Sequence, residues 1–396
     1  MLALRRARLA ASPPFLRGGF RPFFFLGASW AVIALGLWML AYSGNLVLPS
    51  AFEPLSWHRH EMLFGFVGAV IAGFLLTAIP NWTGRLPIAG WPLACLVGLW
   101  AAARLSLLFS AWTGMVAAAI IDVGFYFVLA GLAAREVTLA NNRNLPPVAM
   151  VFLMGVANAA DHAGAAKLVP DADVGIRAAL SIVVMLISLI GGRIIPSFTR
   201  NWMTKQGITL RLPTQPTRFD LAVLVTTGLG LLAWITAPSA VATGGLLIAA
   251  AFAQALRLSR WGGLRSVPDP LVLILHIGYV WVPVGLLLLG ANILGTTVPR
   301  SAAIHALTAG AMATMIVAVM TRVILGHTGR ALNASPLTVL IYGLITLGAV
   351  LRVAASLGML DYTLGMEVAA GTWAGAFALF LAIYGPILFR PRLGTD

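Results

Sequence analysis

The chain has 396 residues, of which 60% are hydrophobic and only 10% are charged. A soluble domain carries about 25% charged residues, so this chain has too few to cover a surface that faces water. The single cysteine, Cys95, excludes a disulfide-rich extracellular scaffold. The net charge of +14 comes from arginines dispersed between apolar runs, which excludes a basic nucleic-acid-binding stripe. The composition therefore predicts an all-α polytopic membrane protein whose surroundings are the lipid bilayer.

Twelve apolar segments are each long enough to cross about 30 Å of hydrocarbon as a helix. They lie at 20–43, 57–80, 89–109, 113–134, 147–166, 173–195, 218–236, 238–256, 270–290, 299–324, 335–356 and 366–389. The loops between them are short, so we predict a single transmembrane domain over residues 1–396. Residues 1–19 lack a signal-peptide cleavage pattern and are predicted to form a cytoplasmic tail.

The charge of the loops predicts the orientation of the spans. Loops on the N-terminal side of the membrane carry most of the arginines, among them Arg85, Arg200 and Arg330. Loops on the opposite side carry few basic residues, such as Lys167, and several acidic ones, such as Asp171. Basic loops remain in the cytoplasm, so both termini are predicted to be cytoplasmic.

One sequence pattern occurs in both the second and the tenth span. Each copy begins at a histidine, His60 or His305, and ends at a Thr-Gly-Arg triplet, 83–85 or 328–330, with the same spacing. The copies also match at Gly65 with Gly310 and at Ile79 with Ile324. The shared histidine and triplet indicate an internal repeat more strongly than matched Ile and Gly residues, which are common in apolar helices.

A weaker third copy lies on the sixth span. There Ile176 occupies the histidine position, Thr199 the threonine position, and Arg193 corresponds to Arg322 of the tenth span. The copies are four spans apart, which favours three four-helix units with pseudo-threefold symmetry, covering 20–134, 147–256 and 270–389. The catalytic subunit of haem-copper oxidases has this arrangement. The alternative is a transporter, whose repeats usually come in pairs.

Ionisable residues inside a membrane are costly and indicate functional sites, and the chain has six histidines. In the predicted topology, four lie near the outer ends of their spans: His58, His60, His162 and His305. The other two, His276 and His327, lie near the inner ends. In a regular helix, His305 and His327 would be about 33 Å apart and on nearly the same face. The two layers are therefore predicted to be separate sites.

Imidazole binds haem iron and copper, so these histidines are candidate ligands. No Cys-x-x-Cys-His motif is present, which excludes covalently attached c-type haem. Because His60 and His305 share the repeat position, we predict that they are the axial ligands of one haem b. His58 points away from His60 on the helix and is predicted to face His162, with copper between them. Alternatively, His58 binds the iron and His60 contacts lipid headgroups.

The inner histidines, His276 and His327, are predicted to form a second haem or copper site. The alternative is a solvated pair at the cytoplasmic surface. The ligand preference of imidazole supports the first interpretation, and the position of both residues near span ends supports the second.

Several charged residues also lie inside the predicted spans. Glu61 either orients a ligand or carries a proton, or it is a helix-start carboxylate stabilised by the helix dipole. Asp122 is either part of a proton pathway or the partner of an arginine such as Arg104. Asp161 is a candidate partner for the histidine that follows it, although adjacent residues point apart. Arg322 either pairs with haem propionates or extends to lipid headgroups.

Several motifs of this sequence resemble the NnrS family. They are GFRPFF at 19–24, WHRHEMLFG at 57–65, AIPNWTGR at 78–85, LHIGYVW at 275–281 and GHTGR at 326–330. Together the motifs extend over most of the chain. The W-H-x-H-E-M and G-H-T-G-R strings are the specific ones.

The resemblance implies a bacterial inner-membrane protein that contains haem and copper and is linked to denitrification and relief of nitric oxide stress. It implies histidine ligands at the motif positions His58, His60, His276, His305 and His327. Haem-copper oxidases carry a His-x-His on span 10 and copper histidines on spans 6 and 7. Here span 10 has one histidine at its outer end, and spans 6 and 7 have none. A standard binuclear reduction site is therefore not expected.

The leading hypothesis is a haem-binding, redox-active membrane protein of the nitric oxide response, with its electron donor open. The first alternative is an enzyme, a nitric oxide or quinol-linked oxidoreductase. The second is a haem-free transporter or metal-delivery protein. Steady-state turnover distinguishes the first two, and a visible spectrum identifies the third, which would be colourless.

Overall fold

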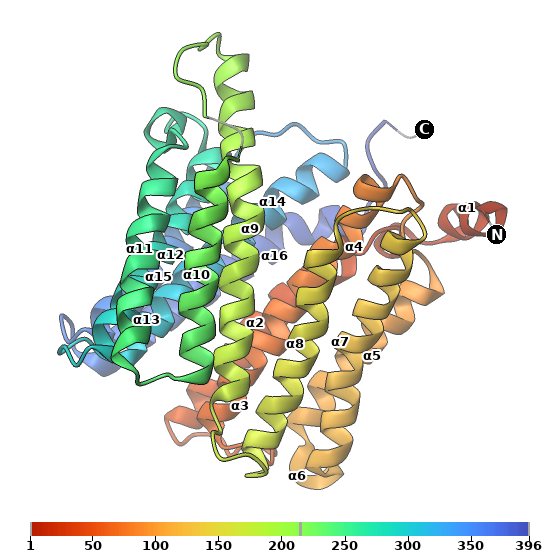
Figure 1. Cartoon of the computed structure of the whole chain (residues 1–396). Helices are drawn as coiled ribbons and strands as arrows, with labels where there is room; N and C mark the ends of the chain where they lie inside the picture. Colours follow the sequence, from red (N-terminus) through yellow and green to blue (C-terminus); the bar gives the residue numbers. More distant parts are fainter. Residues whose placement is uncertain (1, 214–215, 395–396) are drawn as a thin grey trace. The chain divides into compact units, whose positions relative to one another are not determined.

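The computed structural model describes residues 2–213 and 216–394. These residues form helices joined by loops, with no β-strand among them (Figure 1). Over the described part of the chain, twelve helical stretches are long and apolar enough to cross a membrane. The chain is therefore a multi-pass membrane protein, as its composition predicts.

Eleven of these stretches begin and end within four residues of the predicted spans. The membrane-length stretches are α2 (Phe20–Tyr42), α3–η2–α4 (Pro54–Thr83), α5 (Trp91–Leu108), α7 (Met115–Thr138), α8 (Leu145–Ala165), α9 (Val174–Lys205), α10 (Arg218–Thr236), α11 (Val241–Ser259), α12 (Pro270–Ile293), α13–η4–α14 (Arg300–His327), α15 (Pro336–Ser356) and α16 (Tyr362–Leu388). The short helices are α1 (Leu2–Ala11), η1 (Pro14–Leu16), α6 (Ser110–Thr113) and η3 (Gly263–Ser266).

The sixth span differs from its prediction at one end. Helix α9 continues through Pro196 to Lys205, well past the predicted end at residue 195. Its 32 residues correspond to about 48 Å, which exceeds the hydrocarbon thickness of about 30 Å. The last turns are polar, so hydropathy alone ends the span too early. Pro196 has no backbone N–H, so the helix lacks one hydrogen bond at this turn. Transmembrane helices tolerate such a proline because neighbouring groups satisfy the carbonyl that is left free.

The described residues divide into two compact units. Unit 1 comprises 2–179, 323–330 and 380–394, and unit 2 comprises 180–213, 216–322 and 331–379. The pseudo-threefold arrangement of three four-helix units remains a prediction.

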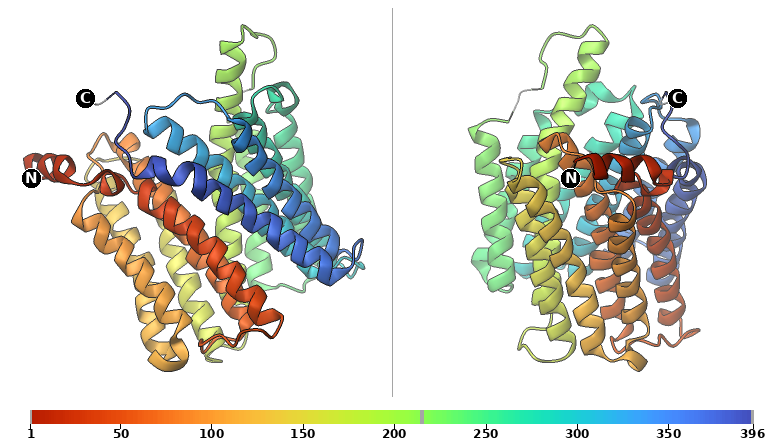
Figure 2. Two further views of the ribbon diagram at one scale, coloured as in Figure 1. Left: turned by 180° about the vertical axis from the view of Figure 1, so that it is seen from behind. Right: turned by 90° about the vertical axis from the view of Figure 1, so that its right-hand side faces the viewer.

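Unit 1 contains both ends of the chain. Helix α2 packs against η2 and α4, and α7 packs against both α5 and α8. The described termini lie at one end of this unit, and α6 lies at the other (Figures 1 and 2). The buried guanidinium of Arg21, from the GFRPFF motif, donates to the carbonyl oxygens of Leu388 and Arg390, each at 2.7 Å. This contact satisfies the C-terminus of α16 and ties the first span to the last segment of the chain.

Unit 2 is built from antiparallel neighbours. Helix α11 packs between α10 and α12, and α15 packs against α13 and η4 (Figure 2). At the α11–α12 contact, a Cβ on Gly244 would lie 3.1 Å from the carbonyl oxygen of Gly290. A Cβ on Gly290 would lie 2.7 Å from the carbonyl oxygen of Gly244. The two backbones approach this closely because neither residue has a side chain.

Two of the long spans are interrupted by π-helical segments at equivalent positions. Segment η2 (Glu61–Val67) follows His60 directly, and η4 (Ala306–Met312) follows His305 directly. In the third copy, α9 shows no such segment and carries Ile176 at the histidine position. The π turn therefore accompanies the histidine, which supports the internal repeat between spans 2 and 10. π-Helical turns are rare and occur frequently at functional sites.

Candidate metal site

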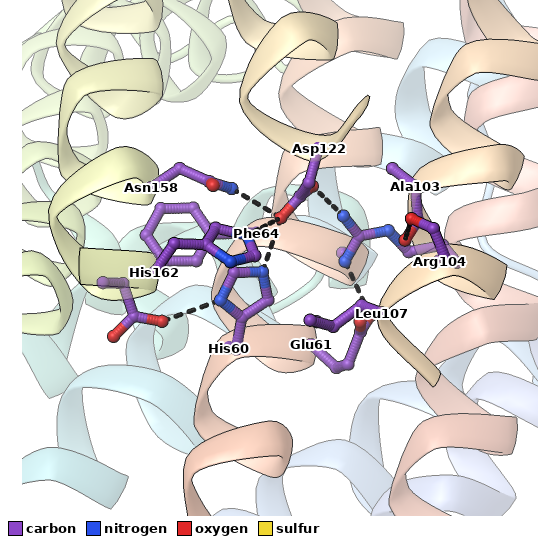
Figure 3. A network of polar contacts seen from close by, with 12 residues as sticks. His60, Glu61, Phe64, Ala103, Arg104, Leu107, Asp122, Asn158 and His162 are labelled. Atoms are coloured by element: carbon purple, nitrogen blue, oxygen red, sulfur yellow. Dashed lines mark hydrogen bonds and ion pairs between the residues drawn. The ribbon is translucent and has the colours of Figure 1, made fainter. Parts of the chain in front are cut away.

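Four helical spans of unit 1 bring polar side chains together in its interior (Figure 3). No side chain of this group is more than 9% exposed. The group, called the buried polar cluster below, consists of His60 and Glu61 at the α3–η2 junction, Arg104 on α5, Asp122 on α7, and Asn158, Asp161 and His162 on α8.

His60 connects two carboxylates. Its Nδ1 lies 2.7 Å from Asp161 Oδ2, and its Nε2 lies 2.7 Å from Asp122 Oδ2. Each distance is that of a charge-assisted hydrogen bond. A carboxylate on Nδ1 fixes the tautomer and the orientation of the ring, as commonly found behind metal-bound histidines.

The same oxygen of Asp122 also receives a second histidine and an amide. His162 Nε2 lies 3.1 Å from Asp122 Oδ2, and Asn158 Nδ2 donates to it at 3.0 Å. The potential ligand atoms of His60, Asp122 and His162 all lie within 4.8 Å of one another. Two imidazoles and one carboxylate in this proximity form a donor set suited to iron, copper or zinc. We call these three residues the metal triad.

Arg104 is the single cation of fixed charge in the cluster. It forms an ion pair with Asp122, and its Nη1 donates to Glu61 Oε2 at 2.7 Å. Trp30 Nε1 donates to the same Glu61 oxygen at 2.6 Å. Arg104 approaches Asp122 from the side opposite the amide of Asn158 (Figure 3).

The fixed charges of the cluster do not cancel. Glu61, Asp122 and Asp161 provide three carboxylates, whereas Arg104 provides one guanidinium. With neutral histidines, the cluster therefore has an excess of negative charge inside the protein. Buried charge is costly unless it is compensated, so the site favours a bound cation or protonated histidines.

Some buried polar atoms of the cluster lack a partner among the described residues. They are Glu61 Oε1, Arg104 Nε, Asn158 Oδ1 and His162 Nδ1. Buried polar atoms are hydrogen-bonded in the great majority of cases, either to protein or to water. A ligand or water molecules bound at the metal triad would supply partners for these atoms.

Gly65 allows the cluster to close. A Cβ at this position would contact Glu61 Oε2, and it would lie 2.8 Å from both Arg104 Nη1 and Trp30 Nε1. The glycine lies within η2, whose wider turn brings it next to the side chain of Glu61. The repeat match at Gly65 therefore has a packing reason, although glycines in apolar helices are common.

The structure shows the contacts of the charged residues whose roles the sequence left open. The predicted ion pair between Asp122 and Arg104 is confirmed. Asp161 contacts His60 rather than its neighbour His162, because adjacent residues on α8 point apart. Glu61 contacts Arg104 and Trp30, so it lies at the edge of the cluster rather than on a histidine.

The outer histidines pair differently from our expectation. His60, rather than His58, is the neighbour of His162, with their ring centroids 5.0 Å apart. His58 stacks on Trp38 at a centroid distance of 4.1 Å. Both ring nitrogens of His60 contact carboxylates, so binding haem iron would require one of these contacts to break. His60 belongs to unit 1 and His305 to unit 2, and their pairing around one haem stays a prediction.

His276 and His327 also belong to different units, so an inner site that joins them stays a prediction. His276 Nε2 lies 2.9 Å from Thr199 Oγ1, whose own proton goes to Ile195 O. His276 must therefore donate to Thr199. His327 packs beside the ring of Phe20, at a centroid distance of 5.6 Å.

The expected common face of His305 and His327 assumed a regular α-helix. Segment η4 lies between them, and a π turn absorbs about one extra residue. One residue corresponds to roughly 100° of rotation, so the expectation from the regular helix does not apply. Arg322 is predicted from the sequence to pair either with haem propionates or with lipid headgroups. Its guanidinium carbon lies over the ring of Phe198, 3.9 Å from the ring centroid.

Comparison with known proteins agrees with the sequence motifs. A protein-family model described as NnrS protein matches residues 14–392, nearly the whole chain. A search of curated proteins found no significant match.

Proposed function

Because the chain belongs to the NnrS family, we propose that this membrane protein acts in the nitric oxide response by binding a redox-active transition metal in the metal triad and haem b elsewhere. Copper is the metal that the family resemblance implies. Copper and haem iron both supply one-electron redox chemistry when bound. The observation that carries the proposal is the buried set of His60, Asp122 and His162 in a cluster with excess negative charge.

The residues around the triad fit the binding of a metal ion. Asp161 would hold the His60 ring with its Nε2 directed toward Asp122, so a metal ion would lie between these two ligands in place of their hydrogen bond. Arg104 would keep the Asp122 carboxylate in place. Asn158 would fix the second face of the same carboxylate. These three side chains orient the ligands and do not themselves bind the metal.

His305 fits haem better than His60 does. Its Nδ1 lies 2.7 Å from the carbonyl oxygen of Ser301, which can only accept a hydrogen bond. Nδ1 therefore carries the proton, and Nε2 keeps its lone pair for iron. His58, His276 and His327 remain candidates for the second axial position.

We further propose a bacterial inner-membrane location with both termini in the cytoplasm. The alternation of basic loops supports this orientation, and both described termini at one end of unit 1 agree with an even number of spans.

A proton-coupled transporter is the second candidate function. Asp161, His60 and Asp122 form a continuous row of titratable groups inside a transmembrane unit. Such rows also occur as proton relays in pumps and transporters. A protein that contains neither haem nor metal would favour this candidate.

Metal analysis of the purified full-length chain tests the proposal. We expect a stoichiometric transition metal besides haem iron, and we expect His162→Gln to lose it. His162 suits this test because its hydrogen bond to Asp122 is its one side-chain hydrogen bond within the described residues, so the fold should survive. The control is Asp173→Asn, which changes a polar residue of unit 1 that pairs with Arg59 and lies outside the cluster. A metal-free wild type, or an unchanged metal content in His162→Gln, contradicts the proposal.

A further inference from the structure

The equivalence of spans 2 and 10 extends to the helices beside them. After span 2, Arg104 lies four residues before the end of α5, and after span 10, Arg352 lies four residues before the end of α15. The glycines match as well. Gly65 packs against Trp30, and Gly310 packs against Trp281, where a Cβ would lie 2.6 Å from the indole ring. Unit 2 therefore contains a second arrangement of histidine, glycine, tryptophan and arginine, formed by His305, Gly310, Trp281 and Arg352.

The two arrangements differ in their acidic residues. Arg104 contacts Glu61 and Asp122, whereas Arg352 has no carboxylate within ion-pair distance among the residues that the structure describes. Ala306 occupies the position that corresponds to Glu61. Arg352 is nevertheless buried, with 9% of its surface exposed. A buried cation without a counter-charge is costly, so an anion from outside unit 2 is expected beside it.

Neutral groups hold the guanidinium of Arg352 in place. Its Nη1 donates to Ser356 Oγ at 2.6 Å, and its Nη2 donates to Tyr362 Oη at 3.4 Å. The guanidinium carbon also lies 5.5 Å from the centre of the Tyr362 ring. A guanidinium has five N–H donors, so these contacts leave donors for a carboxylate or another oxyanion.

His305 is the neighbouring ligand group. Segments α13 and η4 pack on α15 through Ala302, Ala306 and Val353. Ala306 and Val353 directly follow His305 and Arg352 in the chain, so this packing brings the two residues into the same region of unit 2. The protonated Nδ1 of His305 is bound by Ser301, and its Nε2 has no partner among the described residues. A simple anion would be repelled by the lone pair on Nε2. A ligand that presents both a Lewis-acidic atom and a carboxylate satisfies both residues.

We propose that Arg352 binds a propionate of the haem whose iron is held by His305. This inference rests on the proposed haem binding and adds a residue that neither the repeat motif nor the family motifs contain. Arg352 is a positioning residue, because it contacts the edge of the haem and not the iron. The propionate would supply to Arg352 the negative charge that Glu61 and Asp122 supply to its counterpart, Arg104.

Comparing the binding affinities of haem and of its dimethyl ester tests the proposed contact between Arg352 and a propionate. The ester lacks ionised propionates, so the haem-depleted, full-length wild type should bind it about 10- to 100-fold more weakly than haem, the effect of a lost charged hydrogen bond. Arg352→Gln should bind haem more weakly and lose the preference for haem over the ester. Arg352→Lys should keep part of that preference. Arg59→Gln, at a partly buried arginine that pairs with Asp173, is the control and should keep all of it.

The outcomes separate the two proposals. A haem preference that is unchanged in Arg352→Gln overturns the propionate contact and leaves haem binding by His305 intact. A wild-type protein that neither contains haem after purification nor binds added haem overturns both. Loss of haem in His305→Ala together with loss of preference in Arg352→Gln supports both.

Discussion

Asp161→Asn should weaken metal binding in the triad without removing any ligand. Asp161 Oδ2 lies 2.7 Å from His60 Nδ1, and its side chain is 9% exposed. Asparagine keeps the shape of the side chain and an oxygen acceptor but removes the charge. The substitution therefore changes how strongly His60 is held and polarised, while Nε2 of His60, Asp122 and His162 stay in place.

The magnitude follows from the type of contact. A hydrogen bond to a charged group contributes about 1.5–3 kcal/mol. Since each 1.4 kcal/mol corresponds to about tenfold in affinity, its full loss corresponds to roughly 10- to 150-fold. Substitutions behind metal ligands typically cost about 10- to 100-fold in metal affinity. Because asparagine still accepts a neutral hydrogen bond, we expect a loss near tenfold.

Competition with chelators of graded affinity measures this loss on the purified protein. Asp173→Asn is the matched control, since Asp173 is also an acidic residue of unit 1 but pairs with Arg59 at 2.9 Å. It should leave the metal dissociation constant unchanged. If Asp161→Asn binds metal as tightly as the wild type, or if both variants lose affinity equally, then Asp161 does not act through His60 and the reasoning fails.

Three further outcomes are expected. Gly65→Ala should lower the stability by about 1–3 kcal/mol in thermal unfolding, because its methyl group would press on the cluster, whereas Gly98→Ala, which meets nothing within 4 Å, should not. Arg257→Met should lower the stability by about 3–5 kcal/mol, because it removes the close ion-pair partner of the buried Asp220, which lies 2.9 Å away. Arg260 lies 3.8 Å from the same carboxylate and its side chain is 33% exposed, so Arg260→Met should lower the stability by at most about 1 kcal/mol in the same assay. A reporter enzyme that works only in the cytoplasm should be active when it is fused after Arg392, and one that works only outside the cell should be inactive there. The opposite result would refute the predicted topology.

The positions of the spans were predictable because apolar length is a strong signal. The exception, α9, extends past Pro196 in a polar segment that carries no hydropathy signal. The repeat was also visible in the sequence, since His60 and His305 stand at equal distances from their Thr-Gly-Arg triplets. The sequence could not indicate that a π segment follows each histidine, because no residue type specifies that turn.

The members of the site were easier to predict than their contacts. His60, His162, Glu61 and Asp122 could be singled out as ionisable residues within apolar spans. Their pairing depends on how each helix is rotated, and a π turn next to His60 changes that rotation. The role of Asp161 was missed for this reason. A signal was present nonetheless: an Asp-His pair on one helix can serve two partners, because its members face different directions.

The shared π turn also bears on how the chain arose. A π turn forms when a helix accommodates one inserted residue without losing its ends, and the insertion shifts one half of the helix by roughly 100° relative to the other. Spans 2 and 10 both carry it at the same place, so a common ancestor of these two spans that already had the π turn would explain both. The sixth span has the same number of residues between Ile176 and Thr199 but is a regular α-helix, so Ile176 faces a different direction relative to Thr199 than the histidines face relative to their threonines. Ile176 thus occupies the histidine position by count but not by direction, and a histidine introduced there would not face the way that His60 and His305 face in their spans.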